Sequence, residues 1–166
     1  MKNFLNKFWD WYERHYLFNL SIATLLFFVQ LFHLYWLFSD IILSKFTGHS
    51  HFLFPSIWGT VSAFLDYSEI PAIITTTVLY LHLLRKEFGY KILWLLLALN
   101  IQWIHILWIT DEVVIERFNE SFSLFHWANW LAWIAILIDY LELPVIYDTV
   151  KRLIAEIKNK IKSPKS

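Results

Sequence analysis

The sequence predicts an all-α integral membrane protein, a four-helix bundle built from two parallel two-helix repeats. Two observations predict this fold class: an apolar composition and an internal repeat. Hydrophobic residues make up 58% of the 166-residue chain, aromatic residues make up 20%, and only three residues are glycine. This composition is too apolar for an ordinary soluble domain. Four stretches exceed the roughly 20 residues that a helix needs to cross a bilayer core. They cover approximately residues 17–43, 55–84, 92–113 and 123–150.

An internal repeat divides these stretches into two pairs. The motif Gln-x-x-His-x-x-Trp begins at Gln30 in the first stretch and at Gln102 in the third. The motif Asp-Tyr-x-Glu-x-Pro begins at Asp66 in the second and at Asp139 in the fourth. We interpret this as a duplicated two-helix unit. Because each unit contains two spans, both copies insert in the same orientation, related by an axis along the membrane normal. The single transmembrane domain covers residues 1–166, with repeat 1 at about 17–86 and repeat 2 at about 90–160.

The basic residues predict the orientation of the chain. Twelve of the fourteen Lys and Arg residues lie before the first stretch, between the second and third, or after the fourth. By the positive-inside rule, both termini therefore face the cytoplasm in a multi-pass protein of the cell (inner) membrane. The charged, aromatic lead before the first stretch predicts an N-terminal interfacial helix.

The C-terminal tail predicts a basic amphipathic helix that extends beyond the fourth span. Leu153, Ile154, Ile157 and Ile161 recur at helical spacing after Lys151. Basic residues on such a helix favour contact with anionic lipids of the inner leaflet. The same residues can also serve only to fix the topology, and the sequence leaves both interpretations open.

Acidic and histidine side chains inside the apolar stretches point to a functional centre. Each acid in a lipid-embedded helix costs about 2.5–3.5 kcal/mol on insertion scales, and here a pair of acids occurs twice. Helical spacing places the histidines and carboxylates of both repeats on defined faces, within one broad layer of the bilayer. The predicted metal ligands are His33, Asp66, Glu69, His105, Asp139 and Glu142.

The residue types in this set suit a dinuclear metal site. Four carboxylates neutralise two divalent ions, and imidazole favours Fe, Zn, Cu or Ni over Mg and Ca. Soluble di-iron and di-manganese bundles use a similar donor inventory. The predicted cofactor is two divalent transition-metal ions, with Fe or Mn favoured and Zn as an alternative. Haem between His33 and His105 is disfavoured because four carboxylates cluster at the same depth.

Four neighbouring polar residues are expected to support the ligands. Gln30 and Gln102 lie one turn before each histidine and are expected to orient the imidazole rings. Thr76 and Thr149 lie two turns beyond the glutamates and are expected to support these in a similar way.

The leading functional prediction is a di-iron or di-manganese oxidoreductase that acts on a lipophilic or small diffusible substrate. Tyr67 and Tyr140 adjoin the aspartates and are the candidate catalytic groups, as radical or proton-coupled donors; otherwise they are packing residues. A di-zinc centre would instead activate water for hydrolysis. The alternatives are a divalent-cation or proton transporter that uses the same polar core, and a structural subunit of a homo-oligomer or larger membrane complex.

Two classes of chemistry are excluded or unsupported by the composition. The chain has no Cys, which excludes thiolate ligands and disulfides. Nucleic-acid binding has no support beyond the basic tail, whereas the lipid bilayer is the expected partner.

Overall fold

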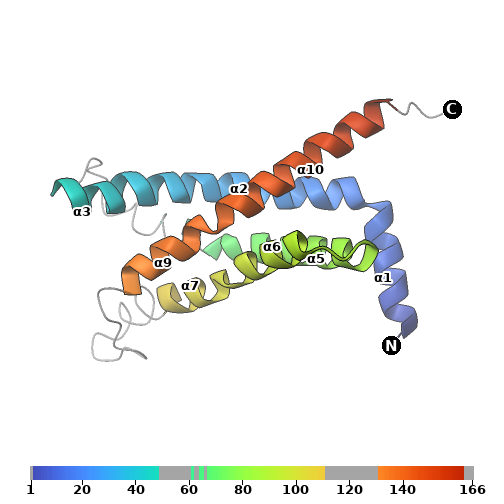
Figure 1. Ribbon diagram of the computed structural model, residues 1–166, viewed down its shortest axis with the longest axis horizontal. Helices are drawn as coiled ribbons and strands as arrows, with labels where there is room; N and C mark the ends of the chain where they lie inside the picture. The colour runs from blue at the N-terminus through green and yellow to red at the C-terminus, as the bar shows by residue number, and fades with distance from the viewer. Residues whose placement is uncertain (1, 49–60, 62–63, 66, 111–130, 163–166) are drawn as a thin grey trace.

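The regular structure of this protein is helical. The computed structural model describes residues 2–48, 61, 64–65, 67–110 and 131–162. Within these ranges no residue lies in a β-strand, so the predicted all-α class is confirmed. The elements are α1 (Lys2–Arg14), α2 (Tyr16–Trp36), the π-helix η1 (Leu37–Ile42), α3 (Leu43–Thr47), α5 (Glu69–Lys86), α6 (Tyr90–Asn100), α7 (Gln102–Ile109), α9 (Leu131–Tyr140) and α10 (Glu142–Lys162) (Figure 1).

Two helical segments are long and apolar enough to cross a membrane. One covers Tyr16–Ser39, with a mean hydropathy of 1.8, and the other covers Tyr90–Leu107, with a mean hydropathy of 1.4. They correspond to the first and third predicted spans. The second and fourth predicted spans each include residues outside the described ranges. Length and composition thus support two of the four spans.

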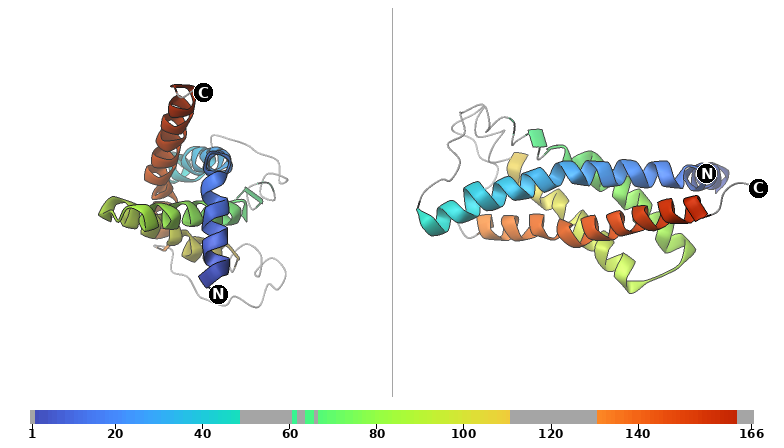
Figure 2. Two further views of the ribbon diagram at one scale, coloured as in Figure 1. Left: turned by 90° about the vertical axis from the view of Figure 1, so that its right-hand side faces the viewer. Right: turned by 90° about the horizontal axis from the view of Figure 1, so that it is seen from above.

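Each of the four helices α2, α5, α6 and α10 packs against two of the others. α2 contacts α5 and α10, and α6 contacts the same two helices. Figures 1 and 2 show α1 at one end of α2, turned across its axis, and the far end of α10 at that same end of the molecule. The two segments predicted to lie on the cytoplasmic side therefore share one end.

Apolar side chains fill the space between these helices. Phe27 of α2, Ile73 of α5, Leu99 of α6 and Val145 of α10 are fully buried and belong to one cluster. Ile73 and Val145 lie about one turn into their helices, next to the polar residues that begin α5 and α10. An apolar layer therefore adjoins the candidate site.

The predicted second and fourth helices are each interrupted at the same place in the repeat. Ser68 and Leu141 are turn residues. Ser68 shares its backbone N–H between the Phe64 carbonyl at 3.1 Å and the Leu65 carbonyl at 3.0 Å, and Leu141 donates to the Ile138 carbonyl at 2.9 Å. The bonds to the Leu65 and Ile138 carbonyls span three residues, so the chain tightens at this turn before α5 and α10 begin.

Proline explains the position of both breaks. Pro71 and Pro144 are the third residues of α5 and α10, where the absent N–H would have no helical partner in any case. Within a continuous helix, each proline ring would press on the carbonyl four residues earlier. Glu69 and Glu142 consequently become the first residues of their helices, where the helix dipole stabilises a carboxylate.

α1 is held against the end of α5 by aromatic and charged contacts. The Trp9 ring stacks on the buried His82 ring with 5.7 Å between centroids, and the Arg85 guanidinium lies 4.6 Å from the Trp9 ring centroid. Glu13 pairs with Lys86, and this hydrogen bond lowers the pKa of the Glu13 carboxyl. These contacts fix α1 across the end of the helices.

Candidate metal centre

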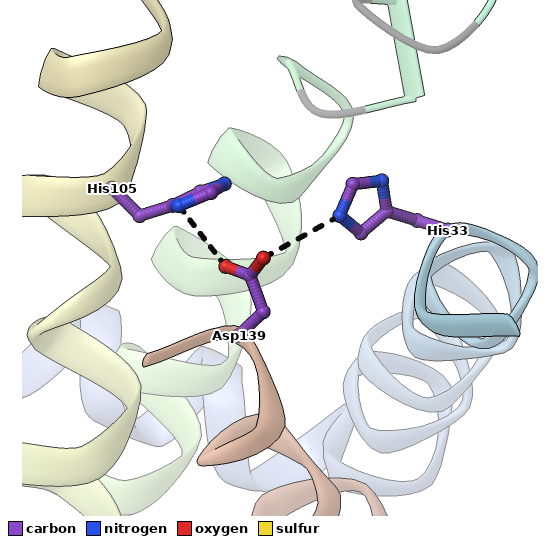
Figure 3. Close-up of side chains that lie close together, drawn as sticks. All are labelled: His33, His105 and Asp139. Carbon is purple, nitrogen blue, oxygen red and sulfur yellow. Dashed lines mark ion pairs between the residues drawn. The ribbon is translucent and has the colours of Figure 1, made fainter. Parts of the chain in front are cut away.

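His33, His105 and Asp139 come together from three different helices. They lie on α2, α7 and α9, and none is more than 4% exposed. The Asp139 carboxylate lies between the two rings, with Oδ1 3.1 Å from His105 Nδ1 and Oδ2 3.7 Å from His33 Nε2 (Figure 3). One donor atom from each residue lies within 4.8 Å of the others. This buried group could hold a metal ion.

The separations of the donor atoms suit one transition-metal ion between them. Ligand atoms at about 2.0–2.2 Å from a tetrahedral ion are roughly 3.4 Å apart. The two distances from Asp139, 3.1 and 3.7 Å, lie on either side of that value. Two imidazoles and one carboxylate also leave coordination positions open, as catalytic sites require.

Two further predicted ligands, Glu69 and Glu142, lie in the same interior region. Each is the first residue of its helix and is 1% exposed. The Glu142 carboxylate is within hydrogen-bonding reach of Glu69. It is also close enough to Asp139 and His33 to interact electrostatically with both. Neither Glu142 oxygen has a donor of favourable geometry among the described residues. Two buried carboxylates at such range repel unless a proton or a cation lies between them.

The sixth predicted ligand, Asp66, lies outside the residues that the structure describes. Its counterpart in the repeat, Asp139, is the carboxylate at the centre of the group. Of the other five predicted ligands, all are buried. Asp139 contacts both His33 and His105. The Glu69 and Glu142 carboxylates are close to each other, and Glu142 is also close to Asp139 and His33.

Gln30 and Gln102 hold the helix breaks in place. Both side chains are fully buried. Gln102 Nε2 donates to the Ile138 carbonyl oxygen at 2.7 Å. Gln30 Nε2 donates to the Leu65 carbonyl, which is equivalent in the repeat, at 3.4 Å and to the Ser68 hydroxyl at 2.9 Å. Each glutamine therefore fixes the turn that positions the following glutamate, a role that the sequence did not reveal. Their action on the histidine rings stays a prediction.

The two candidate catalytic tyrosines reach from one repeat to the other. The Tyr67 hydroxyl lies 2.9 Å from Thr110 Oγ1. The Tyr140 hydroxyl donates to the Leu34 carbonyl at 3.4 Å, and Leu34 directly follows His33. These contacts link the repeats and place Tyr140 beside the candidate centre. A catalytic role for either tyrosine stays a prediction.

The two threonines predicted to support the glutamates lie deeper along the same helices. Thr76 and Thr149 are fully buried. The Thr149 hydroxyl donates to the Val145 and Ile146 carbonyls of its own helix, at 2.9 Å each. These bonds satisfy the hydroxyl locally, and the support of the glutamates stays a prediction.

A second buried aspartate, Asp148, forms a cluster that the sequence did not single out. It lies on α10 and is 3% exposed. Lys91 Nζ is 2.6 Å from its Oδ1, Arg152 Nε is 2.6 Å from its Oδ2, and the Tyr80 hydroxyl donates to it at 3.5 Å. The spacing of Asp148 and Arg152 was a visible signal for a helical ion pair. The Lys91 contact was not, because the two residues are 57 positions apart in the chain.

No family model matches the chain, no curated protein is significantly similar in sequence, and no solved structure is significantly similar in fold. A functional proposal therefore rests on the residues of the site.

Proposed function

We propose that this protein is an integral membrane metalloprotein that acts as a metal-dependent oxidoreductase through its buried His/carboxylate centre. One observation carries the proposal: Asp139 is buried between two histidine rings, beside a facing pair of glutamates. The proposed substrate is lipophilic or a small diffusible molecule, because the centre is enclosed by apolar helices.

The printed ion-pair partners of Asp139 are imidazoles, which carry a positive charge only when they are protonated. Among the residues that the structure describes, no lysine or arginine pairs with Asp139 or Glu142. Burying carboxylates without compensation is very costly. Protons can reduce this cost, but imidazoles and carboxylates together are also the ligands that transition metals bind well. A divalent ion supplies the positive charge and uses the donor atoms already in place.

The donor set favours iron or manganese. Two histidines and one carboxylate with open positions form the facial triad of non-haem Fe(II) oxygenases. Glu69 and Glu142 add two carboxylates and Asp66 is the predicted fourth, and di-iron and di-manganese bundles hold two ions with two histidines and four carboxylates. The proposed centre is therefore dinuclear. When bound, these metals would supply one-electron chemistry, while the histidines and carboxylates would hold them; Tyr140 is the proposed proton-coupled donor.

The apolar layer favours an enzyme over a transporter. Phe27, Ile73 and Val145 are fully buried next to the centre. They lie between the glutamates and the Asp148 cluster, about two turns further along α10. An ion crossing the helices toward that end would have to pass this layer. A substrate that reaches the centre from the lipid or from the opposite end would not.

A four-helix transmembrane arrangement is part of the proposal. The contacts of α2 and α6 with both α5 and α10 support it. The same helix break and the same glutamine–carbonyl hydrogen bond also recur in each repeat. With α1 and the basic end of α10 at one end, the positive-inside rule assigns that end to the cytoplasm.

Metal analysis of the full-length protein purified in detergent tests the proposal. We expect about two Fe or Mn ions per chain, and a loss of metal in Asp139→Asn. Asp148→Asn is the matched control, because it makes the same change at a buried aspartate that has its own basic partners. Wild-type protein that carries no metal after expression with both metals supplied would overturn the proposal.

A further inference from the structure

We propose that the end of α10 lies on the anionic inner leaflet as a lipid-binding surface, separate from the metal centre. This tail surface consists of an apolar stripe and the lysines that border it. Its residues are Ile154, Ile157 and Ile161, with Lys151, Lys158, Lys160 and Lys162.

The apolar stripe is exposed along its whole length. Ile154, Ile157 and Ile161 are 47%, 41% and 74% exposed. Their spacing of three and four residues places them on one side of the helix. Three large aliphatic side chains in one line are costly to leave in water, so this side of α10 requires a cover.

The stripe does not face the other helices. Arg152 and Glu156 are half-buried, and the charges of both act on Tyr16 of α2, so their side of α10 is turned toward the other helices. Ile157 follows Glu156 and points about 100° further around the helix. The isoleucines therefore face outward from the molecule.

Lysines border the stripe on both edges. Lys151 and Lys158 follow one edge and Lys160 the other, while Asn159 lies opposite the isoleucines. A lysine at such an edge lays its aliphatic stem along apolar surface and extends its ammonium group to the headgroups. This distribution is that of a helix lying in the membrane interface.

The position of the tail surface agrees with this arrangement. Figure 1 shows the end of α10 diverging from the other helices, at the same end of the molecule as α1. α1 is the segment predicted to lie in the interface, and its exposed side chains include Phe4 and Trp11. With that end assigned to the cytoplasm, as in the proposed function, the tail surface lies at the level of the lipid headgroups.

The same lysines argue against a second copy of the chain as the cover. If two tails met along their isoleucines, Lys158 and Lys160 of each chain would border the seam and repel those of the other. Phosphate groups of acidic lipids instead attract these residues, and each lysine near an anionic surface raises binding roughly fivefold, or about 1 kcal/mol. Charge thus selects an anionic lipid surface.

The absence of native cysteine allows a clean test. In the full-length protein, Ile157→Cys on the stripe and Asn159→Cys on the opposite side would each carry an environment-sensitive fluorophore. The proteins would be reconstituted in nanodiscs of phosphatidylcholine, with or without phosphatidylglycerol. With phosphatidylglycerol, we expect a blue-shifted label at position 157 that is protected from an aqueous quencher, and an accessible label at 159. Adding Lys158→Glu and Lys160→Glu, or raising the salt concentration, should expose position 157.

Three outcomes would overturn the proposal. The first is equal quenching at both positions in both lipids, and the second is failure of the chain to float with the lipid. The third is protection at position 157 that needs no anionic lipid and disappears when the protein is diluted in the bilayer, which would identify a second copy as the cover. Because the tail surface excludes the metal ligands, none of these outcomes depends on metal content.

Discussion

Two buried aspartates, on the adjoining helices α9 and α10, are neutralised in different ways. Asp148 contacts a lysine and an arginine, each at 2.6 Å. Asp139 contacts two imidazoles and lies beside a glutamate pair, with no lysine or arginine among its partners in the described part of the chain. The lysine and arginine beside Asp148 are permanently charged, whereas the imidazoles beside Asp139 balance its charge only when they are protonated. Buried charge that the fold itself leaves unbalanced is the better indicator of a functional site.

The largest expected difference between the two aspartates is in stabilisation by metal. Adding Fe(II) or Mn(II) to metal-free protein under anaerobic conditions should raise the free energy of unfolding by about 2.7 kcal/mol when the free ion is at about 100 times its Kd. Asp139→Asn should remove this gain, because the central carboxylate is lost. Asp148→Asn should keep the gain and start from a lower stability. Thermal unfolding in detergent, with and without metal, measures both effects.

One result would contradict this prediction. If Asp139→Asn and Asp148→Asn respond to metal alike, the ion acts elsewhere or not at all, and the distinction between the two buried acids is wrong.

A second prediction concerns the sign of the effect in metal-free protein. Asp148→Asn should lower the free energy of unfolding by about 1–3 kcal/mol, because two cations lose their partner. The cost stays below that of a fully buried pair, since the Lys91 side chain is 67% exposed and screened by solvent. Glu142→Gln should instead raise the free energy of unfolding by about 1 kcal/mol, because the amide ends a carboxylate–carboxylate repulsion and can donate to Glu69.

Chemical unfolding of the two variants after treatment with a chelator measures whether each change raises or lowers the free energy of unfolding. Glu142→Leu serves as a control that removes the charge without supplying a donor. If Glu142→Gln destabilises the metal-free protein as much as Asp148→Asn does, then Glu142 already has a compensating partner.

The sequence predicted the all-α class and the residues of the metal group, because both follow from local patterns. Apolar runs long enough for helices and two copies of a His and carboxylate motif are visible without a structure. His33, His105 and Asp139 are among the six ligands that the repeat predicts within one broad layer of the bilayer. The structure brings these three residues together in a buried group that could hold a metal ion, while the full ligand set and the number and type of ions stay predictions.

The helix breaks and the Asp148 cluster could not be predicted from the sequence, for physical reasons. A proline can bend a helix or stand in the first turn of a new one, and only packing decides between these outcomes. At Ile101, between α6 and α7, neither proline nor glycine marks the break. Asp148 meets Lys91 only because α10 packs on α6, which local spacing cannot show.

The smallest predicted loss of folding stability concerns the residues that support the centre. Gln102→Leu should lower the free energy of unfolding by about 1 kcal/mol, because the Ile138 carbonyl loses the amide donor across the helix interface. It should also weaken metal binding roughly 10- to 100-fold, since the turn that positions Glu142 is no longer held. Thr24→Val is the matched control: Thr24 is equally buried, but its hydroxyl donates only within its own helix, to the Leu20 carbonyl at 2.8 Å. Titration of both variants with Mn(II), followed by electron paramagnetic resonance, separates the two roles. A Gln102→Leu protein that loses stability but binds metal as the wild type does would limit this glutamine to the fold, and the Asp139 centre would then owe its geometry to its own ligands alone.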